Sequence, residues 1–294
     1  MHDQQKGTRE GDSVLRQAVE ACEAGLGDRL RAAYALGSLV HGGFSALVSD
    51  VDLGLVLADP IQDSDDERIR VLAHTVRAGG TVLHERLSVF WGTPSTLRGL
   101  SPGGRFPPLD RLDLLENGRL LQGLDVRAGM ARPDRTELLV VGAEFALDYL
   151  GGGRGISEAH SSQLGSMSPG DDSVLEELRT PKVLVSRGPR RLTKLVLFPV
   201  RFLFTAATGQ VGTNAVAVTH YVTNDQAPAR ELVGAALSWR LSPPEDVDGA
   251  AALLEQQLIP LYLHYIDDHI SRLIAAGRAD LASSFERWRL RLVA

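Results

Sequence analysis

Short apolar runs in the first half of the chain predict β-strands, and longer stretches with a period near 3.6 predict helices between them. The predicted strands cover residues 32–36, 51–57 and 83–91, with a short edge strand at 119–121. The predicted helices cover about 13–25, 65–77, 107–117 and 133–150. Pro60 ends the second strand and Gly79-Gly80 ends the second helix. We therefore expect a small β-sheet with flanking helices in this half.

The second half of the chain has an almost wholly helical pattern. Helices are expected at 189–209, 214–222, 227–240, 245–275 and 278–292. The preceding stretch is rich in Gly and Ser and has little apolar periodicity, so it is interpreted as a linker. The expected fold class is α+β, with a small mixed sheet followed by an all-α helical bundle. The expected divisions are a disordered N-terminus at 1–12, a first domain at 13–150, a linker at 151–180 and a helical domain at 181–294.

A glycine–serine pair at the end of the first predicted strand is the strongest sign of chemistry in the chain. A tight turn at Gly37-Ser38 can point backbone N–H groups at phosphate oxygens. Asp50 and Asp52 enter the second strand two residues apart, so both carboxylates are predicted to point to one face. Mg²⁺ is commonly held by one or two carboxylates together with substrate phosphates. The pattern indicates a site for a magnesium–nucleoside triphosphate; the alternative is an ordinary turn followed by two surface aspartates.

Charge and cysteine content limit the partners and the cellular compartment that are expected for this protein. The formal charge of −6 argues against nucleic acid as a required partner. The stretch 178–224 has seven basic residues and no acidic one, so it either faces a polyphosphate or forms a solvated helix surface. Cys22 is the only cysteine, which excludes an intramolecular disulfide and fits a reducing cytoplasm. We expect a cytoplasmic protein without a membrane span, as a monomer or weak dimer.

The Gly-Ser turn followed by Asp-x-Asp on a strand resembles the nucleotidyltransferase superfamily of the DNA polymerase β type. The matching segments are Leu36-Gly37-Ser38 and Asp50-Val51-Asp52-Leu53. The resemblance implies that Gly37 and Ser38 bind the nucleotide and that Asp50 and Asp52 bind one or two Mg²⁺ ions. It also implies the reaction, in which AMP moves from ATP to an acceptor hydroxyl and pyrophosphate leaves.

The same resemblance implies a third carboxylate on a neighbouring strand. Glu85, at the start of the strand expected at 83–91, is the first candidate. The role implied for it is to accept the proton of the attacking hydroxyl or to help bind the metal. Asp125 is the second candidate, and a merely solvent-facing Glu85 is the alternative.

The second half of the chain is similar to the helical domain of the streptomycin/spectinomycin 3″-adenylyltransferases. The similar segments are Arg201–Phe204, Thr208–Val211 and Val216-Ala217. Lys194 and Arg201 share one face of an expected helix, which suits either polyphosphate contact or a basic surface stripe. Those enzymes have a Lys-Asp pair where this chain has Asn214-Ala215. The chain is therefore expected to offer no carboxylate there to a cationic acceptor such as streptomycin.

Three functions are compatible with these residues. The first is Mg²⁺-dependent transfer of AMP from ATP to a small molecule, either an antibiotic or a biosynthetic intermediate. The second is nucleotidyl transfer to a macromolecule, such as a tRNA end or a protein side chain. The third is a nucleotide-binding module without catalysis, and the presence of both aspartates beside the Gly-Ser turn argues against it. The sequence favours the first function.

Overall fold

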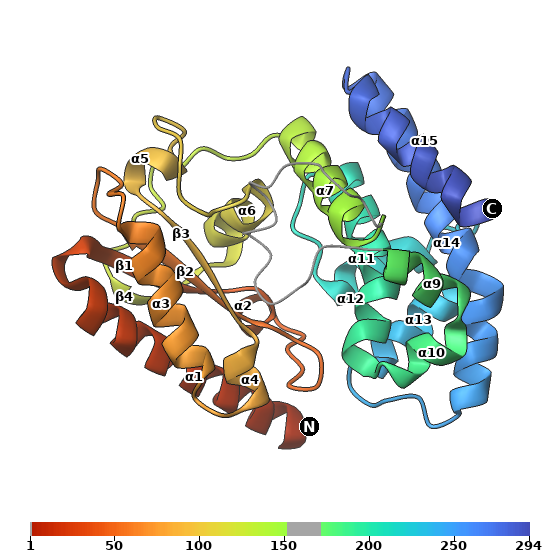
Figure 1. Ribbon diagram of the computed structural model, residues 1–294, viewed down its shortest axis with the longest axis horizontal. Helices are drawn as coiled ribbons and strands as arrows, with labels where there is room; N and C mark the ends of the chain where they lie inside the picture. The colour runs from red at the N-terminus through yellow and green to blue at the C-terminus, as the bar shows by residue number, and fades with distance from the viewer. Residues whose placement is uncertain (1, 152–171) are drawn as a thin grey trace. The chain divides into compact units, whose positions relative to one another are not determined.

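Four strands form one mixed β-sheet in the first part of the computed structural model (Figure 1). The structure describes residues 2–151 and 172–294. In their order across the sheet, the strands are β3 (Leu87–Gly92), β2 (Val51–Leu57), β1 (Leu30–Leu36) and β4 (Arg119–Gly123). β2 and β3 are parallel, whereas β1 is antiparallel to both of its neighbours. This mixed sheet and the helices that follow it confirm the expected α+β fold class.

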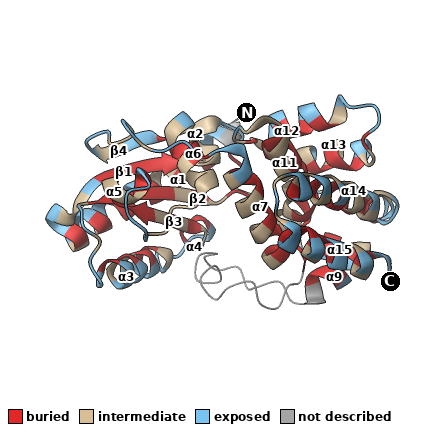
Figure 2. Cartoon of the chain, turned by 90° about the horizontal axis from the view of Figure 1, so that it is seen from above, coloured by how far each residue is buried: buried red, intermediate tan, exposed pale blue. Residues whose placement is uncertain are grey.

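Helices pack on both faces of the sheet, because alternate strand residues point to opposite sides. Helices α1 (His2–Leu26) and α3 (Asp65–Arg77) contribute to the core on one face, which contains Leu53 and Leu55 of β2. Helix α6 (Pro108–Asn117) lies on the other face, where its Leu114 packs with Leu36 of β1. Figure 2 shows long buried stretches along the strands, in red.

Helix α1 is continuous, so the expectation of a disordered N-terminus at 1–12 is wrong. Two glycines in its first half allow it to pack closely on the loop after β1. A Cβ on Gly7 would lie 3.0 Å from Ala46 Cβ, and one on Gly11 would lie 3.0 Å from Leu39 Cδ2. The residues of this segment are mostly polar, so the sequence does not show that the segment packs on another part of the chain. Tertiary packing supplies most of the stability of helices in proteins.

The residues expected to start the third strand form a short helix instead. Helix α4 (Val82–Glu85) precedes β3, which starts only at Leu87. The Thr81 hydroxyl caps α4 by accepting a hydrogen bond from His84 N. The His84 ring is buried, with Nδ1 2.7 Å from Thr81 Oγ1 and Nε2 3.1 Å from Gln17 Oε1 of α1. This cap and the buried ring override the alternating pattern that predicted a strand.

A buried ion pair fastens the start of α3 to the turn before β1. Asp65 is fully buried and pairs with Arg29, which ends the 3-10 turn η1 (Gly27–Arg29). The Asp65 carboxylate also accepts a hydrogen bond from Gln62 N at 2.8 Å, and Arg29 donates to Pro60 O at 3.0 Å. Loss of one partner would leave a buried charge without compensation.

Replacing Asp65 by Asn is therefore expected to lower the free energy of unfolding by about 3 kcal/mol, because the Arg29 guanidinium loses its counter-charge. Urea unfolding followed by circular dichroism measures the change. The matched control is Glu67→Gln on the same helix, whose exposed pair with Arg70 is screened by solvent and contributes little to stability. Equal losses in the two variants would contradict the importance of the buried pair.

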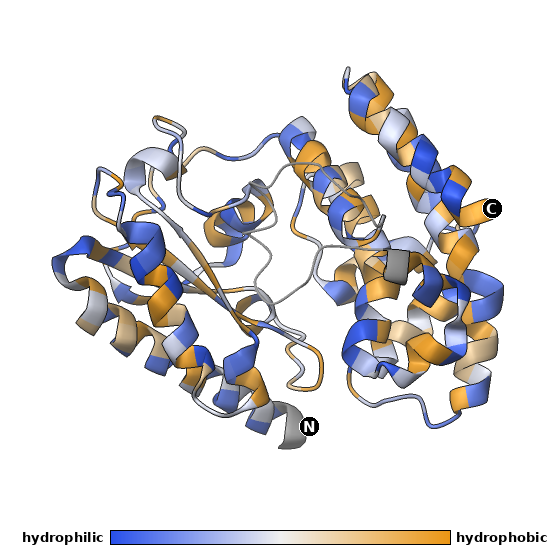
Figure 3. Ribbon diagram, in the orientation of Figure 1, coloured by the Kyte–Doolittle hydropathy of each residue, from blue (hydrophilic) through white to orange (hydrophobic). Residues whose placement is uncertain are grey.

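The second compact unit, Asp134–Ala294, contains only helices in the residues that the structure describes. Its elements are α7 (Arg135–Tyr149), α9 (Asp172–Arg179), α10 (Pro181–Ser186), α11 (Pro189–Thr208), α12 (Asn214–Val222), α13 (Arg230–Trp239), α14 (Val247–Ala275) and α15 (Ala279–Val293). Figure 3 shows hydrophobic and hydrophilic stretches side by side along α14 and α15, as amphipathic helices around a shared core require. None of the described helices combines the length and apolar character needed to cross a membrane.

The division between the two units differs from the expected boundaries. It lies at Pro133, not at residue 150, because α7 buries Leu139, Ala143 and Leu147 in the core of the helical unit. The interpretation of 151–180 as a linker is wrong where it overlaps α9, which packs on the same core through apolar residues. Residues 152–171 lie outside the described residues.

A histidine lies in the core of the helical unit. His269 of α14 is almost fully buried, and its ring stacks on that of Phe285 with a centroid distance of 5.7 Å. Burial lowers the pKa of His269 from its usual 6.5, while Asp268 partly opposes the shift and Arg272 adds to it. The unfolded chain consequently takes up a proton at this position at a higher pH than the folded protein does.

The helical unit is therefore expected to lose stability as the pH falls below about 6.5, by at most about 1.4 kcal/mol per pH unit from this group. Above that pH the histidine is neutral in both states and contributes no such penalty. Urea unfolding near neutral pH and at about pH 5.5 measures the effect, with His269→Phe as the variant that cannot titrate. If the wild type and the variant lost the same stability on acidification, His269 would not be the source.

Candidate active site

The chain leaves β1 in a turn that glycine adopts easily and other residues do not. Gly37 has φ +65° and ψ −153°. Its carbonyl oxygen accepts hydrogen bonds from Val40 N at 3.0 Å and His41 N at 3.2 Å, which start the short helix α2 (Ser38–His41). In the described part of the chain, the N–H groups of Ser38 and Leu39 donate to no protein acceptor. Both groups are therefore open to a bound anion.

Asp52 lies directly beside this turn. It is in register with Leu36 of β1 and Ser88 of β3, so its side chain is on the face of the sheet that α6 covers. A Cβ built on Gly37 would lie only 2.2 Å from Asp52 Oδ2. Asp50 immediately precedes β2, and both aspartates are half-buried. The structure thus brings the glycine–serine turn and Asp52 together, with Asp50 at the start of the same strand.

The loop between α2 and β2 is held by hydrogen bonds to its own serines and to the segment before β3. Ser45 N donates to Ser49 Oγ at 3.0 Å, and both serines are buried. Arg86 donates from Nη1 to the carbonyl oxygens of Ala46 at 2.9 Å and Leu47 at 3.1 Å. The chain that leads into the aspartate pair is therefore fixed in place.

Glu85 does not lie on the sheet where a third carboxylate was expected. It is the exposed last residue of α4, two positions before β3 begins. The β3 residue in register with Asp52 is Ser88, which carries a hydroxyl. Among the described residues, no three His, Cys, Asp or Glu side chains are grouped so that they could hold a metal ion. The role of Glu85 stays a prediction.

A buried carboxylate that the sequence reasoning missed contacts the turn. Asp113 of α6 is 7% exposed, and its Oδ2 accepts a hydrogen bond from Gly37 N at 2.7 Å. Its Oδ1 accepts one from Asn117 Nδ2 at 2.9 Å, one helical turn later. The available signal was an aspartate enclosed by the apolar residues of 112–115 on an expected helix.

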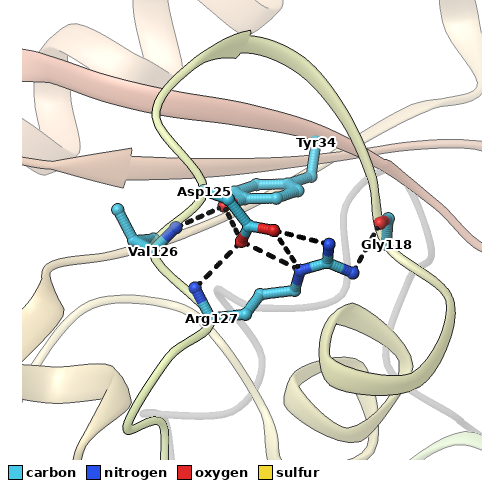
Figure 4. A network of polar contacts seen from close by, with 5 residues as sticks. All are labelled: Tyr34, Gly118, Asp125, Val126 and Arg127. Carbon is cyan, nitrogen blue, oxygen red and sulfur yellow. Dashed lines mark hydrogen bonds and ion pairs between the residues drawn. The ribbon is translucent and has the colours of Figure 1, made fainter.

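Asp125, the second candidate for a third carboxylate, is held in a network that joins the segment after β4 to β1 (Figure 4). Tyr34 Oη donates to Asp125 Oδ1 at 3.0 Å and accepts from Val126 N at 2.8 Å. Arg127 donates hydrogen bonds to both carboxylate oxygens of Asp125, and it also donates to Gly118 O at 2.9 Å. Hydrogen bonds from Arg127 hold the pKa of Asp125 far below its usual range, whereas burial raises the pKa of Tyr34 to about 12. These contacts indicate a structural role for Asp125.

Lys194 and Arg201 both lie on α11 and make contacts inside the helical unit. The Lys194 ammonium is 5.9 Å from the centre of the Phe198 ring, and Arg201 Nε donates to Gly212 O at 2.8 Å. Elsewhere in the basic stretch, Arg191 pairs with the buried Glu177 of α9 at 2.7 Å. Contacts within the helical unit therefore explain the placement of some basic side chains in this stretch. Polyphosphate contact by Lys194 and Arg201 stays a prediction.

No protein-family model matches the chain, and no curated protein matches its sequence. Among solved structures, the chain is similar to a crystal structure of the spectinomycin adenyltransferase AAD(9) from Enterococcus, which contains ATP and spectinomycin. The match has a TM-score of 0.50 and 14% sequence identity, and it covers 84% of this chain and 98% of that chain. The chain has the fold of this adenyltransferase. The resemblance of the sequence to the nucleotidyltransferases is confirmed at the level of the fold. The roles of single residues stay predictions.

Proposed function

We propose that this protein is a nucleotidyltransferase that moves AMP from ATP to a hydroxyl group of a small molecule and releases pyrophosphate. The observation that carries the proposal is the contact between the Gly37 turn and the Asp52 carboxylate. It sets open backbone N–H donors beside a carboxylate, and recognition of a metal–triphosphate uses both kinds of group. The adenyltransferase fold supports the same activity.

The residues of the turn have distinct tasks in this reaction. The N–H groups of Ser38 and Leu39 bind phosphate oxygens, and Gly37 lets the backbone lie against Asp52. Asp50 and Asp52 would hold one or two Mg²⁺ ions, since carboxylate oxygens are ligands that this ion prefers and both enter the same strand. A bound Mg²⁺ would neutralise charge on the triphosphate and on the leaving pyrophosphate.

The acceptor hydroxyl has to lose a proton as it attacks the α-phosphorus. Glu85 is the proposed base, because it is an exposed carboxylate at the end of the sheet where Asp50 precedes β2. We further propose that Lys194 and Arg201 bind the triphosphate through their positive charge. AAD(9) has been crystallised with spectinomycin, so an antibiotic of this kind is the proposed acceptor class.

Calorimetric titration with ATP, with and without Mg²⁺, tests the proposal. ATP is expected to bind only when Mg²⁺ is present, and pyrophosphate is expected to appear when spectinomycin or a related antibiotic is added. Absence of binding for ATP, GTP, CTP and UTP alike would contradict the proposal. Pyrophosphate release only with tRNA, with an affinity that falls steeply as salt rises, would favour a macromolecular acceptor instead.

A further inference from the structure

The carboxylate of Asp113 occupies a buried position behind the glycine–serine turn. Helix α6 brings it there by packing on β1 through Leu114. Among the described residues its hydrogen bonds come from Gly37 N and Asn117 Nδ2, and no ion pair joins it. A buried carboxylate depends on strong donors for its stability. The 2.7 Å bond from Gly37 N is therefore a principal contact of this side chain.

The turn, for its part, needs a contact of this kind. Glycine has more backbone freedom than any other residue, so Gly37 does not fix its own conformation. Three contacts hold it: α2 bonds to its carbonyl oxygen, Asp52 lies beside its Cα, and Asp113 accepts from its N–H. Asp113 is the one acceptor for this N–H among the described residues.

We infer that Asp113 is a positioning residue that holds the Gly37-Ser38 turn in its phosphate-binding conformation. The inference rests on the proposed function, because it assigns the turn to nucleotide phosphates. Asp113 acts through Gly37 N and does not itself touch the nucleotide. What the turn requires from Asp113 is a hydrogen-bond acceptor, so an amide oxygen at the same place can replace the carboxylate.

Three variants separate this role from a packing role. Asp113→Leu removes the acceptor and puts an apolar side chain of similar size in its place. Asp113→Asn keeps an acceptor for Gly37 N, and the Asn117 amide can turn to present its oxygen to the new NH₂ group. Glu116→Leu makes a comparable change on the same helix, at a residue whose contact is with Arg132 rather than with the turn.

Two measurements are made on each variant of the full chain. Calorimetry gives the dissociation constant of ATP with Mg²⁺, and NMR of the protein labelled with ¹⁵N-glycine gives the hydrogen-exchange rate of the Gly37 amide. Asp113→Leu is expected to weaken ATP binding and to speed exchange by at least about tenfold each, because the amide loses its acceptor. Asp113→Asn and Glu116→Leu are expected to stay within about threefold of the wild type in both.

The outcomes distinguish this inference from the proposed function. A folded Asp113→Leu with wild-type ATP affinity and wild-type exchange at Gly37 would overturn the inference. If Asp113→Leu does not fold, Asp113→Asn decides, because loss of ATP binding in that variant would show that the charge is required and would overturn the acceptor role. If the wild type binds no nucleotide, the proposed function fails, and the exchange rate of Gly37 still shows whether Asp113 holds the turn.

Discussion

Replacing Gly37 by Ala is expected to weaken ATP binding by at least about 100-fold, which corresponds to about 2.7 kcal/mol. Two physical causes add. The backbone conformation, with φ +65° and ψ −153°, belongs to a region that is essentially restricted to glycine. The new methyl group would also lie 2.2 Å from Asp52 Oδ2, so either the turn or the carboxylate has to move. Calorimetric titration of the variant with ATP and Mg²⁺ measures the loss.

Gly80→Ala is the matched control for this experiment. Gly80 has φ +86° in the connection between α3 and α4, and a Cβ there would meet nothing within 4 Å. In this variant an alanine has to adopt a positive φ, but its methyl group clashes with nothing. It should therefore lose a little stability and keep its ATP affinity. If Gly37→Ala were folded and bound ATP as the wild type does, the turn would not be the phosphate site.

Asp52→Asn is expected to lower turnover by at least about 1,000-fold. Addition of Mg²⁺ is expected no longer to promote ATP binding in this variant. The amide has the size of the carboxylate, so the contact with Gly37 is kept. It carries no negative charge, however, and is a poorer ligand for a hard divalent cation. Pyrophosphate release and ATP titrations with and without Mg²⁺ measure both effects.

Asp63→Asn provides the comparison, since Asp63 is an exposed aspartate before α3 that is not part of the proposed site. It should behave as the wild type in both assays. Asp50→Asn, measured in parallel, shows whether the second aspartate contributes as much as the first. Persistence of Mg²⁺-dependent ATP binding in the Asp52→Asn protein would place the metal elsewhere.

The central strands and α3 could be predicted from the sequence because local signals agree with the tertiary structure. The apolar run of β2 ends shortly before Pro60, and α3 begins with three acidic residues in its first turn. The helices from residue 189 onward are predictable for the same reason, since the apolar periodicity of each marks the face that it buries. The short helix α10 (Pro181–Ser186) is not among the expected helices.

The wrong predictions share a cause, because in each of them a distant contact decides a local structure. The first turns of α1 are polar and become a helix because two glycines let them pack on the loop after β1. The alternating pattern around Glu85 predicts a strand, but the contact of the buried His84 with Gln17 stabilises a helix there. Neither contact leaves a periodic signal in the residues that it organises.

The candidate site was predictable in its contiguous part only. The turn and the two aspartates lie within a short stretch of chain, and Gly37 and Asp52 meet in the structure. The sequence ranks Asp125 second to Glu85 and does not single out Asp113, because the contacts of these two aspartates depend on which face α6 presents and on where Arg127 reaches. In the structure, the buried carboxylate that contacts the turn is that of Asp113.

The pairing of β1 with β4 also has a consequence for how the protein is made. The hydrogen bond from Gly37 to Asp113 spans 76 residues, and β1 pairs with β4 as far along the chain as Gly123. A ribosome releases the chain from the N-terminus, so the glycine–serine turn emerges long before the residue that anchors it. The nascent chain can assemble β1, β2 and β3 early, but the proposed nucleotide-binding surface is completed only after α6 and β4 have left the exit tunnel.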